Sequence, residues 1–334
     1  MVHMKKLLSP KELIHSFPLE RKDLSFIEES RKTIQKILSN EENRKLLIVG
    51  PCSIHDESST LEYANHFIAL SQKVKNFFLV LRFFIEKPRT SVGWTGFLAD
   101  PMLDGSYQME KGLFLSRKLL HTLVQKKIPC GMEFLHPNFA PYFSDLISWG
   151  VIGSRTSSSQ IHRQLASSLP FAVGFKNSHL EAVEVTLHSL LAARARHVFP
   201  IIDEEGKIAL CHSQGNPYAH IVLRGNSKGP NCDEHTIDSL LQKLSPLSLL
   251  IDCSHGNSSK NLEKQKECFR HVVLTEKKEV RGFMLESHLF SGNQNPTNSL
   301  QYGLSITDPC LGWEETEELI LSADTAIARS PLPA

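Results

Sequence analysis

The segment that decides the fold is Phe77-Phe78-Leu79-Val80-Leu81-Arg82, which continues as Phe83-Phe84-Ile85-Glu86-Lys87-Pro88-Arg89. Its first half is a short, continuous apolar run, which is typical of a buried strand. The second half turns into a loop that carries cations and is stiffened by Pro88. Three cations, Arg82, Lys87 and Arg89, follow one another closely at the end of the predicted strand. Such a cluster indicates either an anion site or a solvated basic turn.

The same order recurs along the chain: a short apolar run, a polar or glycine break, then an amphipathic stretch. The predicted strands are 46–50, 78–84, 129–135, 151–154, 171–175, 220–223, 247–252 and 280–285. The predicted helices include 61–75, 112–127, 178–196, 262–274 and 313–329. Near-continuous apolar strands that alternate with helices favour a parallel sheet, and eight such units favour a closed (β/α)₈ TIM barrel.

Two segments do not fit the repeat. Residues 1–45 are predicted to form an N-terminal helical extension, with one helix from Pro10 and a second capped by Asp23. Residues 197–212 predict a β-hairpin inserted before strand six, with a glycine in its turn. The catalytic barrel is therefore expected to span residues 46–334.

Composition excludes several classes of protein. A net charge of +1 provides no general attraction to nucleic acid or to an acidic membrane, and no apolar run is long enough to span a bilayer. The seven cysteines are odd in number, scattered and without a CxxC pair. This pattern predicts a reducing compartment and a cytoplasmic protein.

In a TIM barrel the functional groups stand at the carboxyl ends of the strands. Predicted strands two, four, five and six end in cations, which are Arg82, Lys87, Arg89, Arg155, Lys176 and Arg224. Around an empty mouth these charges would repel one another, each pair by about 1 kcal/mol or more. A ligand with phosphate or carboxylate groups removes that repulsion, so the pattern predicts a polyanion site.

A second group follows strands one, seven and eight, which are neighbours once the barrel closes. Cys52, His255 and Glu286 form a mixed soft and hard ligand set that suits a divalent transition metal. Asp308 is the candidate fourth ligand, although a turn or a helix cap also explains it. Taken alone, Cys52 could instead be a buried thiol. His255 and Glu286 could likewise be a hydrogen-bonded structural pair without a metal. His55, Asp56 and His288 are rival ligands, expected further out along their loops.

These residues lie in motifs that resemble class I (type I alpha) 3-deoxy-D-arabino-heptulosonate 7-phosphate (DAHP) synthases. The motifs are Gly-Pro-Cys-Ser-Ile-His-Asp at 50–56, Glu-Lys-Pro-Arg-Thr at 86–90, Gly-Phe-Lys-Asn at 174–177, Leu-Arg-Gly at 223–225, Ile-Asp-Cys-Ser-His at 251–255, Glu-Ser-His-Leu at 286–289 and Ser-Ile-Thr-Asp at 305–308. The resemblance runs in order from about residue 5 to the final helix. It implies a transferase that condenses phosphoenolpyruvate with erythrose 4-phosphate in the first step of the shikimate pathway.

The resemblance also implies the role of each site residue. It places the metal (Mn, Fe, Co or Zn) on Cys52, His255, Glu286 and Asp308, phosphoenolpyruvate on Arg82, Lys87, Arg155, Lys176 and Arg224, and erythrose 4-phosphate on Lys87, Pro88, Arg89 and Thr90. The catalytic groups are then Lys87, as general acid, with Cys52 and His255. Relatives form homodimers and homotetramers and are inhibited by aromatic amino acids, so self-association and such an inhibitor are expected here.

Three other functions are weighed against this one. A related synthase that uses arabinose 5-phosphate carries Lys-Ala-Asn-Arg where this chain has Lys87-Pro88-Arg89-Thr90. A Schiff-base aldolase would use Lys87 or Lys176 as its nucleophile. A sensor would bind phosphorylated metabolites and metal without turnover.

Overall fold

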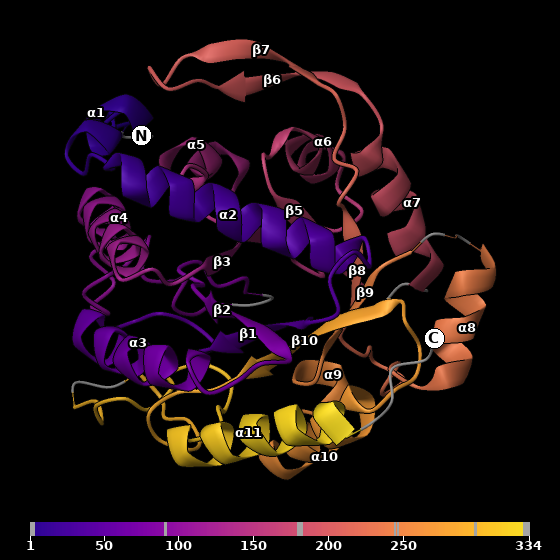
Figure 1. The fold of residues 1–334 in the computed structure, drawn as a ribbon. Helices are drawn as coiled ribbons and strands as arrows, with labels where there is room; N and C mark the ends of the chain where they lie inside the picture. Colours follow the sequence, from indigo (N-terminus) through magenta and orange to yellow (C-terminus); the bar gives the residue numbers. More distant parts are fainter. Residues whose placement is uncertain are drawn as a thin grey trace.

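The computed structural model describes residues 4–89, 92–178, 183–243, 245, 247–296 and 299–329. Its centre is a closed barrel of eight parallel strands in the order β1-β10-β9-β8-β5-β4-β3-β2, drawn in Figure 1. The strands are β1 (Lys45–Gly50), β2 (Phe77–Arg82), β3 (Cys130–Glu133), β4 (Trp149–Ile152), β5 (Ala172–Lys176), β8 (His220–Leu223), β9 (Leu249–Asp252) and β10 (Val280–Glu286). The barrel closes where β1 pairs with β10, and the predicted (β/α)₈ fold is confirmed.

Helices surround the barrel (Figure 1). They are α3 (Glu57–Ser71), α4 (Met109–Gln125), α5 (Ala140–Phe143), α6 (Gln160–Ser168), α7 (Val183–Arg194), α8 (Glu234–Lys243), α9 (His255–Ser258), α10 (Leu262–Val273) and α11 (Trp313–Arg329), with a short 3₁₀ turn, Pro137–Phe139. The helix predicted over 313–329 is confirmed at both ends. The first residues of the helix predicted over 178–196 lie partly outside the described residues, and β4 begins two residues before its predicted start.

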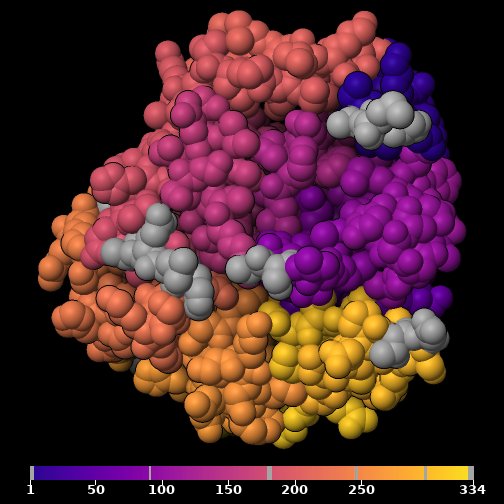
Figure 2. Space-filling view, turned by 180° about the vertical axis from the view of Figure 1, so that it is seen from behind, coloured from indigo at the N-terminus to yellow at the C-terminus, as the bar shows by residue number. Residues whose placement is uncertain are grey.

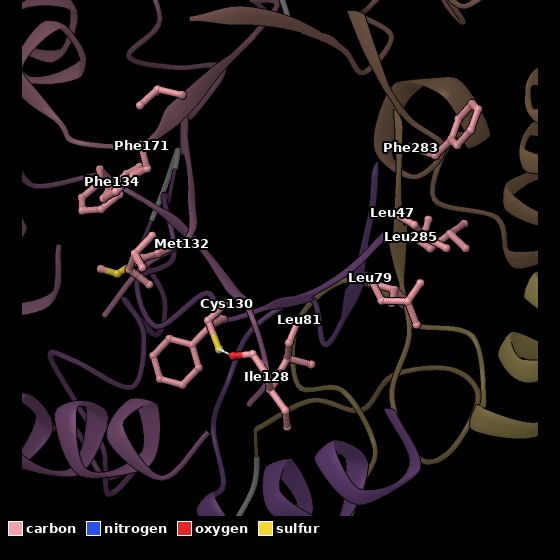
Figure 3. Close-up of a cluster of buried hydrophobic side chains, with 14 of the residues drawn as sticks. Leu47, Leu79, Leu81, Ile128, Cys130, Met132, Phe134, Phe171, Phe283 and Leu285 are labelled. Carbon is pink, nitrogen blue, oxygen red and sulfur yellow. Dashed lines mark hydrogen bonds between the residues drawn. The ribbon is translucent and has the colours of Figure 1, made fainter. Parts of the chain in front are cut away.

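Alternation along each strand divides the core into two layers. In β1, Leu46 and Ile48 point into the barrel and pack with Trp149, whereas Leu47 and Val49 belong to the larger layer between the strands and the helices. Ten side chains of that outer layer are labelled in Figure 3, where the thiol of Cys130 contacts the carbonyl oxygen of Ile128. The strands are thus apolar on both faces, as in other parallel barrels.

The N-terminal helices close the barrel at the amino-terminal ends of its strands. After α1 (Pro10–His15), α2 (Arg21–Leu38) lies across that end and adds Ile34, Ile37 and Leu38 to the interior cluster. Ser248, just before β9, donates a hydrogen bond of 2.6 Å to the carbonyl oxygen of Leu38. With one end covered by α2, the opposite end carries the open site.

The start of α2 differs from the prediction. The helix begins at Arg21, and its N-cap is Glu20 and not Asp23. The carboxylate of Asp23 instead accepts a hydrogen bond from the Glu20 backbone N–H at 3.2 Å, and it forms an ion pair with Lys127. An acidic residue at the third position of a helix can accept a hydrogen bond from the backbone N–H of the N-cap residue. Asp23 therefore stabilises the start of the helix, but it lies three residues after the N-cap.

The predicted hairpin is confirmed as β6 (His197–Ile202) and β7 (Ile208–Ser213), which pair antiparallel just before β8. It projects from the barrel beside the N-terminal residues at the top of Figure 2. The backbone N–H of Lys11 donates to the carbonyl oxygen of Glu204 at 2.8 Å, which fastens α1 to the hairpin turn. None of the described helices is long and apolar enough to cross a membrane.

Candidate active site

A cavity of about 720 Å³ opens at the carboxyl ends of the strands. All six cations predicted from the strand ends line it. The lining residues are Arg82, Lys87, Pro88, Arg89, Glu133, Ser154, Arg155, Ser158, Lys176, Ser178, Arg224, His255, Lys260 and Asp308. A larger hollow of about 1170 Å³ lies between the N-terminal segment and the hairpin, but none of these groups reaches it.

Arg82 is held in place by the barrel wall. It is buried, and it donates to the carboxylate of Glu286 at 2.8 Å and to the carbonyl oxygen of Pro51 at 3.1 Å. Its guanidinium also stacks 3.9 Å above the ring of Phe84. One nitrogen, Nη1, is buried without a hydrogen-bond partner. A buried unpaired donor is costly, so this atom is positioned for a ligand acceptor.

Two further cations have similar surroundings. The amine of Lys176 lies 3.6 Å from a carboxylate oxygen of Glu133 and 3.6 Å from one of Asp252. Arg224 is buried, and its Nη1 atom also has no hydrogen-bond partner. Arg155 and Arg89 lie at the more exposed rim, where Nε of Arg89 donates to the carbonyl oxygen of Trp94 at 2.8 Å. The cavity therefore has a buried cationic wall and a cationic rim, while Thr90 lies outside the described residues.

The predicted metal ligands come together beside this wall. The thiol sulfur of Cys52 and one carboxylate oxygen each of Glu286 and Asp308 all lie within 4.8 Å of one another. His255 joins them through Nε2, which is 3.5 Å from the carboxylate of Glu286. One sulfur, one nitrogen and two carboxylate oxygens form a donor set that fits a divalent transition metal. Cys52 and Glu286 are buried, whereas His255 and Asp308 line the cavity.

The charges of this cluster follow from its surroundings. Burial opposes ionisation of Glu286 and Asp308, but neighbouring cations outweigh it. His255 and Arg82 lower the pKa of Glu286, and Lys87 and Lys260 lower that of Asp308 to about 2. Burial and Glu286 together raise the pKa of the Cys52 thiol. Without metal the carboxylates are ionised and the thiol is protonated, which is how metal binding releases a proton.

Lys87 connects the two halves of the site. Its amine lies 2.7 Å from the sulfur of Cys52. Burial alone would lower the pKa of Lys87, but Cys52, Glu286 and Asp308 raise it above its usual range. The side chain is therefore a firmly protonated ammonium between the cationic wall and the metal ligands.

A model of the DAHP synthetase I family matches residues 21–321 of this chain. The chain belongs to the DAHP synthetase I family. It is 41% identical over 325 residues to the Tyr-sensitive phospho-2-dehydro-3-deoxyheptonate aldolase of Escherichia coli K12, a match that covers 94% of this chain and 91% of that protein. It is 40% identical to the Trp-sensitive enzyme of the same organism, over 97% of this chain and 96% of that one.

A solved structure agrees with this assignment. The phospho-2-dehydro-3-deoxyheptonate aldolase of Francisella tularensis SCHU S4 is similar with a TM-score of 0.93 and 37% identity, covering 97% of this chain and 98% of that one. The resemblance to class I DAHP synthases drawn from the motifs is confirmed, and so is the expectation of an enzyme.

Several acidic residues of the site were not assigned from the sequence. Asp252 is buried, and a carboxylate oxygen lies 3.0 Å from Nδ1 of His255 as well as near Lys176. Glu133 faces the same lysine. Glu133 and Asp252 each stand at the carboxyl end of a strand, so the rule that identified the cations also identifies these two carboxylates. The repulsion expected among the cations is therefore offset in part by the carboxylates that lie beside them.

The rival ligands take other positions. His55 and His288 are buried, with ring centroids 5.6 Å apart. Asp56 caps α3 by accepting a hydrogen bond from the Ser59 N–H at 2.6 Å. Among the described residues, the metal-type cluster includes none of the three.

Proposed function

We propose that this enzyme condenses phosphoenolpyruvate with erythrose 4-phosphate, with addition of one water, to give DAHP and phosphate. This is the first step of the shikimate pathway, and a divalent metal would be its cofactor. One observation carries the proposal: the 2.7 Å contact between Lys87 and Cys52, which joins the anion-binding wall to the metal-type cluster in one cavity. Family membership supports the same reaction.

The cationic wall suits phosphoenolpyruvate, which has a phosphate and a carboxylate. Arg82 and Arg224 each retain a buried Nη1 atom that can donate to it, and Lys176 and Arg155 add two more positive groups. Arginine binds planar oxyanions in a fixed geometry, so these contacts would orient C3 of the substrate toward the second substrate. The rim residues Pro88 and Arg89, with Thr90, would hold the phosphate of erythrose 4-phosphate.

The metal would be held by Cys52, His255, Glu286 and Asp308. When bound, it supplies Lewis acidity toward the aldehyde oxygen of the second substrate. Asp252, beside Nδ1 of His255, would orient the imidazole so that Nε2 faces the other ligands, as partner carboxylates do at many metal sites.

Lys87 would protonate the alkoxide that forms when C3 of phosphoenolpyruvate attacks the aldehyde carbon. It can act as general acid because its neighbours keep it charged, so that it carries the proton to be donated. The same shift argues against Lys87 as a Schiff-base nucleophile, because an amine nucleophile must lose its proton and such lysines have lowered pKa values.

A phosphate-release assay tests the proposal. Purified protein loaded with Mn²⁺ should release phosphate from phosphoenolpyruvate with erythrose 4-phosphate, and a chelator should abolish this release until metal is restored. A preference for arabinose 5-phosphate would assign the related synthase instead. If phosphoenolpyruvate binds to the Mn²⁺-loaded protein but no phosphate is released, the sensor function stands.

We also propose that the protein is a homodimer or homotetramer. The outer face of the hairpin exposes Val198, Ile208 and Leu210, whose exposed fractions are 58%, 79% and 65%. Apolar side chains on an exposed two-stranded sheet are unfavourable in water and are covered when copies associate. Light scattering on wild type and on Ile208→Lys tests this. Titrating the phosphate-release assay with Phe, Tyr and Trp identifies the aromatic inhibitor.

A further inference from the structure

Two cysteines outside the metal-type cluster lie in contact. Cys232 follows β8 and precedes α8, and Cys268 lies in α10. Their sulfur atoms are 3.8 Å apart, and both residues are only partly buried. A disulfide has sulfurs about 2.05 Å apart, so bond formation requires them to approach by about 1.8 Å. Side-chain rotation and movement of the loop before Cys232 would share this change.

The loop before Cys232 is fastened to Gly225, the residue after Arg224. The side-chain oxygen of Asn231 accepts a hydrogen bond of 2.7 Å from the backbone N–H of Gly225, which adjoins Arg224. Gly225 itself packs so closely on Gly256 that an added Cβ would lie 2.3 Å from its carbonyl carbon. A displacement at Cys232 would therefore act, through Asn231 and Gly225, on the backbone next to Arg224.

The same loop is tied to the end of β9. The backbone N–H of Asn231 donates to the side-chain oxygen of Asn257 at 2.9 Å, and the amide of Asn257 donates to the carbonyl oxygens of Leu223 at 3.1 Å and Asp252 at 2.9 Å. All three hydrogen bonds are buried. Closely packed, hydrogen-bonded contacts of this kind transmit small displacements.

The helix that carries Cys268 also contacts the site. Gln265, one turn earlier in α10, accepts hydrogen bonds from the backbone N–H of Glu286 at 2.8 Å and from the hydroxyl of Ser254 at 2.5 Å. Cys232 and Cys268 thus connect the strand end that bears Arg224 with the helix that supports Glu286.

We propose that Cys232 and Cys268 form a redox-active pair, and that their oxidation to a disulfide weakens the binding of the anionic substrate at Arg224. The second part rests on the proposed function. The co-reactant is a hydroperoxide, a two-electron oxidant. One thiolate attacks the peroxide oxygen and breaks the O–O bond, giving a sulfenic acid and an alcohol or water. The second thiol then displaces the sulfenic hydroxyl as water, so two thiols lose two electrons and two protons.

The surroundings of the pair keep it reduced under ordinary conditions. A hydrogen bond to Cys268 and burial raise the pKa of Cys232, so its reactive thiolate is scarce at neutral pH. The pair therefore reacts only with an excess of oxidant. The two cysteines of the site, Cys52 and Cys310, are more deeply buried, and the sulfur of Cys310 accepts a hydrogen bond from the Cys52 N–H at 3.4 Å.

Peptide mapping tests the pairing directly. Full-length, metal-loaded protein is treated with excess hydrogen peroxide, its free thiols are alkylated, and it is digested with trypsin without reduction. The expected product is a linked pair of peptides, residues 229–243 and 267–270, which dithiothreitol separates. A link between 244–260 and 267–270 would assign the pairing to Cys253 and overturn the proposal, as would the absence of any link.

Kinetics tests the consequence. Oxidised wild type should show a KM for phosphoenolpyruvate raised on the order of tenfold, restored by dithiothreitol, because a shift of about 1 Å at a binding group has effects of this size or larger. Cys232→Ser and Cys268→Ser keep Cys52 and Cys310, and neither should show a reversible change. A linked wild type with an unchanged KM overturns the proposal. Lack of phosphate release before oxidation would instead refute the proposed function and leave the peptide map as an independent result.

Discussion

Replacing Lys87 by methionine separates metal binding from catalysis. The amine lies 2.7 Å from the sulfur of Cys52 and near the carboxylates of Glu286 and Asp308, and methionine fills the same space without the proton or the charge. Because burial raises the pKa of Cys52, its thiol stays neutral when the lysine is removed. Glu286 keeps its ion pair with Arg82 and Asp308 keeps its ion pair with Lys260, so neither carboxylate is left unpaired and the protein should fold.

The expected magnitude follows from the role of Lys87. A positioned general acid contributes about 10²- to 10⁴-fold to the rate, which corresponds to about 3–5 kcal/mol of transition-state stabilisation. Lys87→Met should therefore lower kcat in the phosphate-release assay by at least a hundredfold. Equilibrium dialysis should still detect metal binding, since the four ligands are unchanged.

A matched control lies in the same cavity. Lys260 forms an ion pair with Asp308 at 2.8 Å, but its side chain is 57% exposed. Lys260→Met should reduce kcat far less, because an exposed pair of this kind contributes about 1 kcal/mol or less. If Lys87→Met retains kcat within fivefold of wild type, or if both variants lose activity equally, the general-acid role of Lys87 is wrong.

Three further predictions concern groups around the same site. In metal-free protein, Arg82→Met should lower the free energy of unfolding by about 3–5 kcal/mol in urea titrations, because the buried carboxylate of Glu286 loses its 2.8 Å ion pair. Arg82→Met combined with Glu286→Gln should recover part of this loss. Burial raises the pKa of Glu86 from 4.5 to about 7, so the folded state favours the protonated carboxyl. The contribution of Glu86 to the free energy of unfolding is therefore complete below pH 4.5 and is lost as the pH rises through 7. Glu86→Gln should then stabilise the protein by about 2 kcal/mol at pH 8 and have little effect at pH 4, and equal effects at both values would contradict this sign. Arg89→Ala should raise the KM for erythrose 4-phosphate about tenfold and leave that for phosphoenolpyruvate unchanged, because Arg89 lies at the rim and not in the buried wall.

The barrel and the site cations were accessible from the sequence because they depend on local patterns. A buried parallel strand is apolar on both faces, so runs such as 46–50 and 280–285 are visible without knowledge of their neighbours. Since all strands of a parallel barrel run the same way, any residue after a run lies at the same end. Arg82, Lys176 and Arg224 could therefore be gathered by their place in each unit alone.

The acid–base pairings depended on the tertiary structure. Asp252 also ends a strand, but only the closed barrel shows that it lies between Lys176 and His255, groups from two different strand ends. Interaction energies depend on distances of a few ångströms and on exclusion of water, and neither is encoded in spacing along the chain. The sequence by itself determined which end of the barrel bears the chemistry. The fold decided that Arg82 pairs with Glu286, that Lys87 touches Cys52, and that two cysteines 36 residues apart lie in contact.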